Sequence, residues 1–244
     1  MPEIRPIFYW MPESPPCRTV YVVAKMIGLK DWDIKSIDLT KLEQMSDDYL
    51  KINPFHTIPG YFEPPDFNLY ESRTIARYII ETYRPESSLY PMNDVRKRAM
   101  INRCMDYELG TLFRAMSDVV LPIFKPGQGL PNKEKLSRFI QVLEEFEKNL
   151  KQNQLKYLAG GNDITLADLA TYFTLIMCEA VPELIDLSHY PNLYSWLNRI
   201  DNFIKELDSN KNNVDAGVLV KAQENFCTYA KYCQQQAQEQ KRSE

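Results

Sequence analysis

Several features that mark common protein classes are missing from this chain of 244 residues. The net charge of −4 provides no broad basic field, so no nucleic-acid partner is indicated. This charge is still compatible with a small basic pocket for an anionic ligand. No stretch approaches the roughly 18–20 uninterrupted apolar residues that cross a bilayer, so no membrane span is expected. Residues 1–16 hold charges and prolines where a signal peptide needs an apolar run. These absences predict a cytoplasmic protein.

The cysteines form no pattern typical of a disulfide framework or a zinc site. There are five of them, at positions 17, 104, 178, 227 and 233, with no CxxC motif and no Cys/His cluster. An odd count at such spacings fits free thiols in a reducing compartment. No bound metal is therefore expected.

With 44% hydrophobic residues, the chain can bury one large core or two small ones. In the first third, Ser14 and Pro15 suit the start of a helix and Gly28 suits its end, while Ser72 suits the cap of a later helix. The expected order is a strand (7–10), a helix (15–27), a half-buried strand (34–39), a helix (40–53), two hairpin strands (58–62 and 67–70) and a helix (73–83). This order is β-α-β-α-β-β-α.

Strand signals vanish after Pro91. Apolar residues recur at helical spacing on two segments, first as Leu136, Phe139, Ile140, Leu143, Phe146 and Leu150, then as Leu193, Trp196, Leu197, Ile200, Phe203, Ile204 and Leu207. Between them, Thr165 and Asp168 match a helix capping box. Leu219, Ala222, Phe226 and Cys233 could line a weakly amphipathic helix in the tail, whose polar end is expected to fray.

These patterns predict a two-domain protein with an α/β domain followed by an all-α domain. The expected boundaries are an N-terminal domain at 1–84, a linker at 85–91, an all-helical domain at 92–210 and a C-terminal extension at 211–244 that is partly helical or disordered.

The loop between the first strand and the first helix is suited to thiol chemistry, because helix N-terminal amides there favour a sulfur anion. Thioredoxin-like proteins place a CxxC motif here, and this chain has Ser14 and Cys17. A thiol with a pKa near 8.5 is only about 3% ionised at pH 7, and lowering that pKa by about 2 units needs about 2.7 kcal/mol. One charge-assisted hydrogen bond and a helix N-terminus supply that amount. Ser14 is thus suited to activating a bound thiol, whereas Cys17 is expected to be buried and inert.

Two further segments could hold the carrier of that thiol. A cis-Pro59 before a strand would turn the backbone of Ile58 outward to pair with an extended peptide, and His56 could meet a carboxylate. At the next helix start, the amides of Ser72 and Arg73 could bind a second carboxylate. Glu71 could bind an ammonium group there.

The motifs SPPCR, NPFHTIP, YESRTI and ITLADLA, in this order, resemble those of cytosolic glutathione transferases. The pattern is most similar to the serine-type delta/epsilon group of arthropods, over about residues 5–205. The resemblance implies a thioredoxin-like glutathione-binding domain, a helical domain with an acceptor pocket, and a homodimer. It also implies that Ser14 activates the thiol of glutathione, the co-substrate. The implied glutathione-binding residues are Gln44, His56, Ile58, Pro59, Glu71, Ser72 and Arg73.

The chain departs from the family pattern at some positions. Trp10 stands where tyrosine-type relatives carry the activating tyrosine, and Tyr9 would face the other side of the strand. Gln44 replaces a histidine that is common in the delta/epsilon group. The candidate acceptor-pocket residues are Tyr107, Phe113 and Arg114.

The expected activity is conjugation of the glutathione thiolate to electrophilic, mainly hydrophobic small molecules, as in detoxification. Two alternatives stay open at this point. One is a non-catalytic member that binds glutathione or hydrophobic ligands, and the other is a glutathione-dependent thiol reductase that uses Cys17. The sequence does not name the acceptor.

Overall fold

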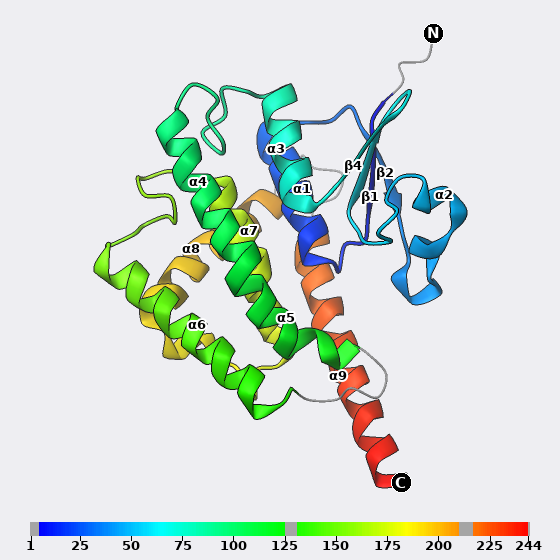
Figure 1. Ribbon diagram of the computed structural model, residues 1–244, viewed down its shortest axis with the longest axis vertical. Coiled ribbons are helices and arrows are strands. Elements are labelled where there is room, and N and C mark those ends of the chain that lie inside the picture. The colour runs from blue at the N-terminus through cyan, green and yellow to red at the C-terminus, as the bar shows by residue number, and fades with distance from the viewer. Residues whose placement is uncertain (1–4, 125–130, 210–216, 244) are drawn as a thin grey trace. The chain divides into compact units, whose positions relative to one another are not determined.

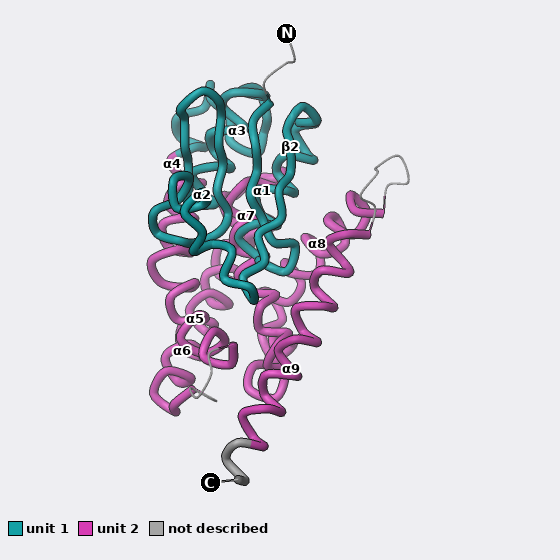
Figure 2. Tube along the Cα trace, turned by 90° about the vertical axis from the view of Figure 1, so that its right-hand side faces the viewer, with its two compact units in different colours: residues 1–98 teal, residues 99–244 magenta. Residues whose placement is uncertain are grey.

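The computed structural model describes residues 5–124, 131–209 and 217–243. The chain divides into two compact units, Met1–Arg98 and Ala99–Glu244, which Figure 2 shows in two colours. The division falls inside helix α4 (Val95–Tyr107). The first unit combines strands and helices, and the described residues of the second unit form helices and no strand. The predicted fold class, a thioredoxin-like α/β part followed by an all-helical part, is confirmed.

The first unit has the predicted order of elements. They are β1 (Ile7–Trp10), α1 (Pro15–Ile27), β2 (Asp33–Ser36), α2 (Asp47–Leu50), β3 (Gly60–Glu63), β4 (Phe67–Tyr70) and α3 (Ser72–Tyr83). The strands lie in the order β2-β1-β3-β4, with β2 parallel to β1 and the other neighbours antiparallel. Helices α1 and α3 pack together on one side of the sheet, and α2 lies on the other side (Figure 1).

Helix α1 begins and ends at the predicted residues. Ser14 is the N-cap and Pro15 is the first helical residue, where a proline's missing N–H costs no intrahelical bond. Gly28 adopts a left-handed φ of 72° and donates to the carbonyls of Ala24 and Lys25, so the helix stops there. Most of α1 is buried; it packs against α3, and its Tyr21 stacks on Trp10 of β1.

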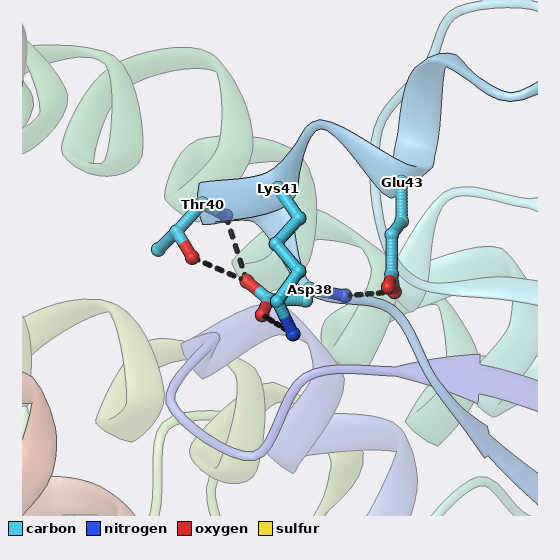
Figure 3. A network of polar contacts seen from close by, with 4 residues as sticks. All are labelled: Asp38, Thr40, Lys41 and Glu43. Carbon is cyan, nitrogen blue, oxygen red and sulfur yellow. Dashed lines mark hydrogen bonds and ion pairs between the residues drawn. The ribbon is translucent and has the colours of Figure 1, made fainter.

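Three predictions in the first unit are wrong in detail. The segment 40–53 is no continuous helix but two 3₁₀ turns, η1 (Leu39–Lys41) and η2 (Glu43–Met45), followed by α2. Asp38 caps η1 by accepting a hydrogen bond from the N–H of Thr40 (Figure 3), and the segment is broken at Leu42, which is left-handed, and at Ser46, which is extended. Strand β2 ends at Ser36, and all four of its residues are exposed because it lies at the edge of the sheet. Ser72 is the first residue of α3 rather than its cap, and Glu71 is the N-cap.

The second unit is built from helices, several of them joined by short 3₁₀ or π-helical segments. Beyond α4 they are η3 (Glu108–Phe113, π-helical), α5 (Arg114–Val120), η4 (Leu121–Phe124), α6 (Lys133–Gln152), α7 (Leu166–Leu175), η5 (Ile176–Ala180), η6 (Leu187–His189), α8 (Pro191–Asp208) and α9 (Val218–Ser243). The apolar faces predicted for α6 and α8 pack against each other, with Phe139, Leu143, Leu193 and Trp196 among their buried residues.

The capping box at the start of α7 is confirmed and has a wider role. The Asp168 carboxylate accepts hydrogen bonds from the N–H and the hydroxyl of Thr165, at 2.9 and 2.8 Å. It also accepts from the N–H of Leu158 and from Nε1 of Trp196, both at 2.9 Å. Burial raises the pKa of Asp168 although four donors surround it. One buried carboxylate thereby joins α7, α8 and the chain before α7.

The tail is more ordered than predicted, because α9 continues to Ser243 instead of fraying. The Asp208 carboxylate accepts hydrogen bonds from the N–H groups of Leu219 and Val220, each at 3.2 Å, and so satisfies amides at the helix start. Farther along, Gln223 and Gln234 donate to the carbonyls of residues 176 and 180 on η5. The glutamines of this segment therefore dock the helix instead of leaving it solvated.

Candidate functional site

Strand register brings the four segments with candidate site residues to one end of the sheet. Tyr9, near the end of β1, pairs with Gly60 at the start of β3, and Gly60 pairs with Tyr70 at the end of β4. On the other side of β1, the N–H of Ile37 donates to the carbonyl of Trp10 at 2.8 Å. The chain after β1, the chain after β2, the chain before β3 and the chain after β4 consequently all lie at this end. These segments carry Ser14, Gln44, Ile58 and Glu71–Arg73 respectively.

Ser14 lies at the N-terminus of α1 with its backbone fixed at both sides. Its N–H donates to the carbonyl of Met11 at 3.0 Å, and its carbonyl accepts from the N–H of Arg18 at 3.1 Å. The side chain is 9% exposed and forms no capping hydrogen bond to its own helix. Its hydroxyl therefore does not cap α1, and its contact within the helix is with the thiol of Cys17.

Cys17 is fully buried one turn into α1. Burial raises the pKa of its thiol to about 12, and hydrogen bonds at Ser14 and Met11 oppose that rise only in part. With a pKa near 12, about one thiol in 100,000 is ionised at pH 7. The expectation of a buried cysteine is met, and this thiol is a poor nucleophile.

The aromatic pair at the end of β1 points to opposite faces of the sheet. Trp10 is buried and stacks on Tyr21 of α1, with ring centroids 4.8 Å apart. The ring of Tyr9 packs edge-on against Tyr49 of α2 and lies below the Lys35 ammonium. Tyr9 is thus held on the side of the sheet away from α1.

The loop before β3 is shaped by two residues that sequence reasoning did not single out. Asn53 is completely buried and donates to the carbonyl and the hydroxyl of Thr57, at 2.8 and 3.0 Å. The hydroxyl of Tyr49 donates to the same carbonyl at 2.6 Å. No sequence pattern indicates that Asn53 is completely buried, and only the structure shows it. These bonds hold the backbone between His56 and Ile58.

That loop has two unusual backbone conformations. The Ile58–Pro59 bond is cis, as predicted. His56 has a φ of +49°, which costs a non-glycine residue about 1–3 kcal/mol and is often found at functional sites. Its side chain is exposed and forms no hydrogen bond or ion pair with the described part of the chain.

The start of α3 has a second strained residue. Glu71 has a φ of +71°, and its carbonyl accepts from the N–H groups of Thr74 and Ile75, each at 2.9 Å. The amides of Ser72 and Arg73 lie at the start of the helix, ahead of these donors. The Arg73 guanidinium donates to the Ser72 hydroxyl at 3.0 Å, and both side chains are buried. Glu71 itself is exposed.

Comparison with known proteins fits this geometry. The model of the glutathione S-transferase N-terminal domain matches residues 8–87, and that of the C-terminal domain matches residues 115–202. Glutathione S-transferase D7 of Anopheles gambiae is 34% identical over 194 residues, which cover 80% of this chain and 85% of that protein. The chain belongs to the glutathione S-transferase family.

Solved structures agree with this assignment. A delta-class glutathione transferase of Nilaparvata lugens superposes with a TM-score of 0.78 at 28% identity, covering 93% of this chain and 99% of that one. An epsilon-class glutathione S-transferase of the housefly Musca domestica also has a TM-score of 0.78, at 25% identity, covering 94% and 98%. This glutathione S-transferase is therefore an enzyme of the transferase class, with glutathione as its co-substrate.

No group of three or more His, Cys, Asp or Glu side chains in the part of the chain that the structure describes could hold a metal ion. None of the helices described is both long and apolar enough to cross a membrane.

In the helical unit of the transferase, the three candidate acceptor-pocket residues have different surroundings. Tyr107 is half-buried and stacks on Phe146 of α6, with ring centroids 6.4 Å apart. Phe113 is half-buried at the end of the π-helical segment, and Arg114 is exposed. Tyr107 therefore belongs in part to the packing between α4 and α6.

Sequence reasoning missed an aromatic cluster between η4 and α9. The ring of Phe124 lies 5.2 Å from that of Phe226 and 6.0 Å from that of Tyr229, which stacks on Tyr232. Tyr229 and Tyr232 are 45% and 56% exposed, so the cluster presents aromatic surface to solvent. The helical spacing of residues 226 and 229 was the available signal, but nothing in the sequence linked them to Phe124.

Proposed function

We propose that the Ser14 hydroxyl donates a hydrogen bond to the sulfur of bound glutathione and keeps it as a thiolate. The observation that carries this proposal is that Ser14 lies at a helix N-terminus without capping that helix through its side chain. The hydroxyl contacts the thiol of Cys17 but is not used to cap α1, and the partial positive charge of the helix start favours an anion beside it. The thiolate then attacks an electrophilic carbon, a C–S bond forms, and the leaving group departs with its electron pair.

The stabilisation expected from this hydrogen bond and the helix N-terminus is as large as the required shift in the thiol pKa. One charge-assisted hydrogen bond contributes about 1.5–3 kcal/mol and a helix N-terminus about 0.3–1 kcal/mol. Lowering a thiol pKa from about 8.5 to about 6.5 needs about 2.7 kcal/mol. Serine in this position therefore suffices without a general base.

The remaining contacts would hold glutathione as an extended peptide. We assign its glycyl carboxylate to His56 and Gln44, and its cysteinyl backbone to Ile58, which precedes cis-Pro59. Its γ-glutamyl end would meet Glu71 and the N–H groups of Ser72 and Arg73. The positive φ angles at residues 56 and 71 support this assignment, since strained backbone concentrates at binding sites.

The acceptor is proposed to be a hydrophobic electrophile, as expected of a detoxifying enzyme. Its contacts would come from the helical unit, from Tyr107, Phe113 and Arg114. The aromatic cluster around Phe124 and Tyr229 offers further apolar surface of the kind that binds such molecules.

We further propose a cytoplasmic homodimer. The domain assignment would be a glutathione-binding domain at 1–84, a linker at 85–91, an acceptor-binding helical domain at 92–210 and an extension at 211–244. The extension would stabilise the helical domain, since α9 packs on η5 and α8.

The proposed chemistry predicts a low pKa for enzyme-bound glutathione. Thiolate absorption in the ultraviolet, recorded against pH with saturating glutathione, should have its midpoint about 2 pH units below that of the free thiol. The protein without glutathione serves as the baseline. A midpoint equal to that of free glutathione would show that the protein binds the peptide without activating it.

Cys17 is expected to be dispensable for the reaction. The Cys17→Ala variant should keep conjugation within about threefold of wild type, because a buried thiol with a pKa of about 12 supplies no nucleophile. The companion measurement incubates the wild-type protein with glutathione disulfide and maps modified peptides by mass spectrometry. Modification should be confined to the other cysteines, and a mixed disulfide at Cys17 with loss of activity in the variant would instead support a thiol reductase.

A further inference from the structure

The segment from Asp38 to Ser46 is folded by polar contacts of its own, four members of which are drawn in Figure 3. Oδ1 of Asp38 accepts from the N–H of Thr40 at 2.9 Å and from its hydroxyl at 2.6 Å. Oδ2 of Asp38 lies 3.0 Å from Nζ of Lys41. The Thr40 hydrogen bond, with Lys41 adding to it, lowers the pKa of Asp38 to about 2. The carboxylate is thus a permanent acceptor at the start of η1.

The backbone of the same residue closes a ring with Glu43. Its N–H donates to Oε2 of Glu43 at 2.8 Å, and its carbonyl accepts the N–H of Glu43 at 3.2 Å. Within the ring, Leu42 adopts a left-handed φ of 59°. Ser46 then ties the ring to α2, because its hydroxyl donates to the Glu43 carbonyl at 2.8 Å and accepts from the N–H of Tyr49 at 3.3 Å. The backbone on both sides of Gln44 is therefore held in place.

Gln44 itself is left with an unused polar atom. Its Oε1 is covered from solvent and has no hydrogen-bond partner among the described residues. A covered acceptor without a partner is unfavourable and points to a ligand or a water molecule that completes the site. The carboxamide offers a donor for a carboxylate and an acceptor for a peptide N–H, and the glycyl end of glutathione carries both.

We infer that Asp38 is a positioning residue for glutathione. Its carboxylate, through Thr40 and Lys41, holds η1 inside the ring 38–43 so that Gln44 meets the glycyl end of the peptide. The inference rests on the proposed function, since it deepens the glutathione site described there. Asp38 acts through the fold of the loop and not by touching glutathione. It therefore affects affinity for the glycyl end and not the reactivity of the sulfur.

The test compares glutathione with γ-glutamylcysteine, which lacks the glycine, by isothermal titration calorimetry. Asp38→Ala should bind glutathione about five- to tenfold more weakly than wild type, the size of a lost cap. It should bind γ-glutamylcysteine within about twofold of wild type, because the glycyl contact is absent from that complex. In turnover, the KM for glutathione should rise with little change in kcat. Asp38→Asn, which keeps an oxygen for the Thr40 N–H, should recover part of the affinity.

A double-mutant cycle with Gln44→Ala identifies the route of the effect. In that background Asp38→Ala should cause no further loss, and an additive loss would overturn the inference. Asp48→Ala is the matched control, because Asp48 forms an exposed ion pair with Lys51 at 2.7 Å nearby but takes no part in the ring. Equal weakening of both peptides, or none, would also overturn the inference. Failure of the wild-type protein to bind glutathione would instead refute the proposed function.

Discussion

Replacing Ser14 with alanine is expected to remove most of the transferase activity without harming the fold. The lost hydrogen bond to the thiolate should raise the pKa of bound glutathione by about 1–2 units and lower kcat/KM by about 10–150-fold. Because the Ser14 side chain forms no capping bond in α1, the substitution should leave the thermal midpoint nearly unchanged. Ultraviolet titration of the bound thiol and steady-state conjugation at saturating glutathione measure the two effects separately.

Two companion variants sharpen this test. Ser14→Thr keeps a hydroxyl at the helix start and should recover part of the activity, with the loss set by its added methyl group. Tyr9→Phe should leave the thiol pKa unchanged, since the ring of Tyr9 packs against Tyr49 and Lys35 on the far side of the sheet. The serine mechanism would be wrong if Tyr9→Phe, and not Ser14→Ala, raised the pKa of the thiol.

Replacing Asp168 with alanine is expected to have the largest effect on stability. It would leave four donors without their acceptor, among them Nε1 of Trp196 and the N–H of Leu158, both in the interior. Each buried donor without a partner costs about 1–3 kcal/mol, so a total loss of at least about 4 kcal/mol is expected for the four. Urea unfolding followed by circular dichroism and tryptophan fluorescence measures it. A loss below about 1 kcal/mol would show that water replaces the carboxylate.

The pH dependence of that loss has a definite sign. Burial raises the pKa of Asp168 in the folded protein, so folding takes up a proton there and acid pH favours the folded state through this group. The stability gap between wild type and Asp168→Ala should therefore widen as the pH falls through the folded pKa toward the pKa of an unfolded aspartate. Asp186→Ala is the matched control, since Asp186 is exposed and its hydrogen bond from Ser188 lowers its pKa. Its much smaller gap should narrow as the pH falls.

The sequence predictions that proved correct concern interactions between residues close together in the chain. Ser14, Pro15 and Gly28 act on the backbone within one turn of themselves, so their positions predicted the ends of α1. The capping box of Thr165 and Asp168 lies within four residues and was equally predictable from the sequence. In contrast, the continuous helix predicted over 40–53 was wrong because Leu42 adopts a left-handed φ and Ser46 an extended backbone, which divide the segment into short turns. Helical propensity alone does not indicate those breaks.

By itself, the sequence determined the order of the elements, the family motifs and the serine at the start of α1, since all of these depend on neighbouring residues. Only the tertiary structure decided what those residues meet. Strand register brought the segments after β1, β2 and β4 to one end of the sheet with the loop before β3. Tertiary packing also brings Asp168 into contact with Trp196 and the glutamines of α9 into contact with η5. It buries Asn53 where its side chain holds the loop that contains His56. Contacts of this kind join residues far apart in the chain, and their energies depend on packing that no local pattern records.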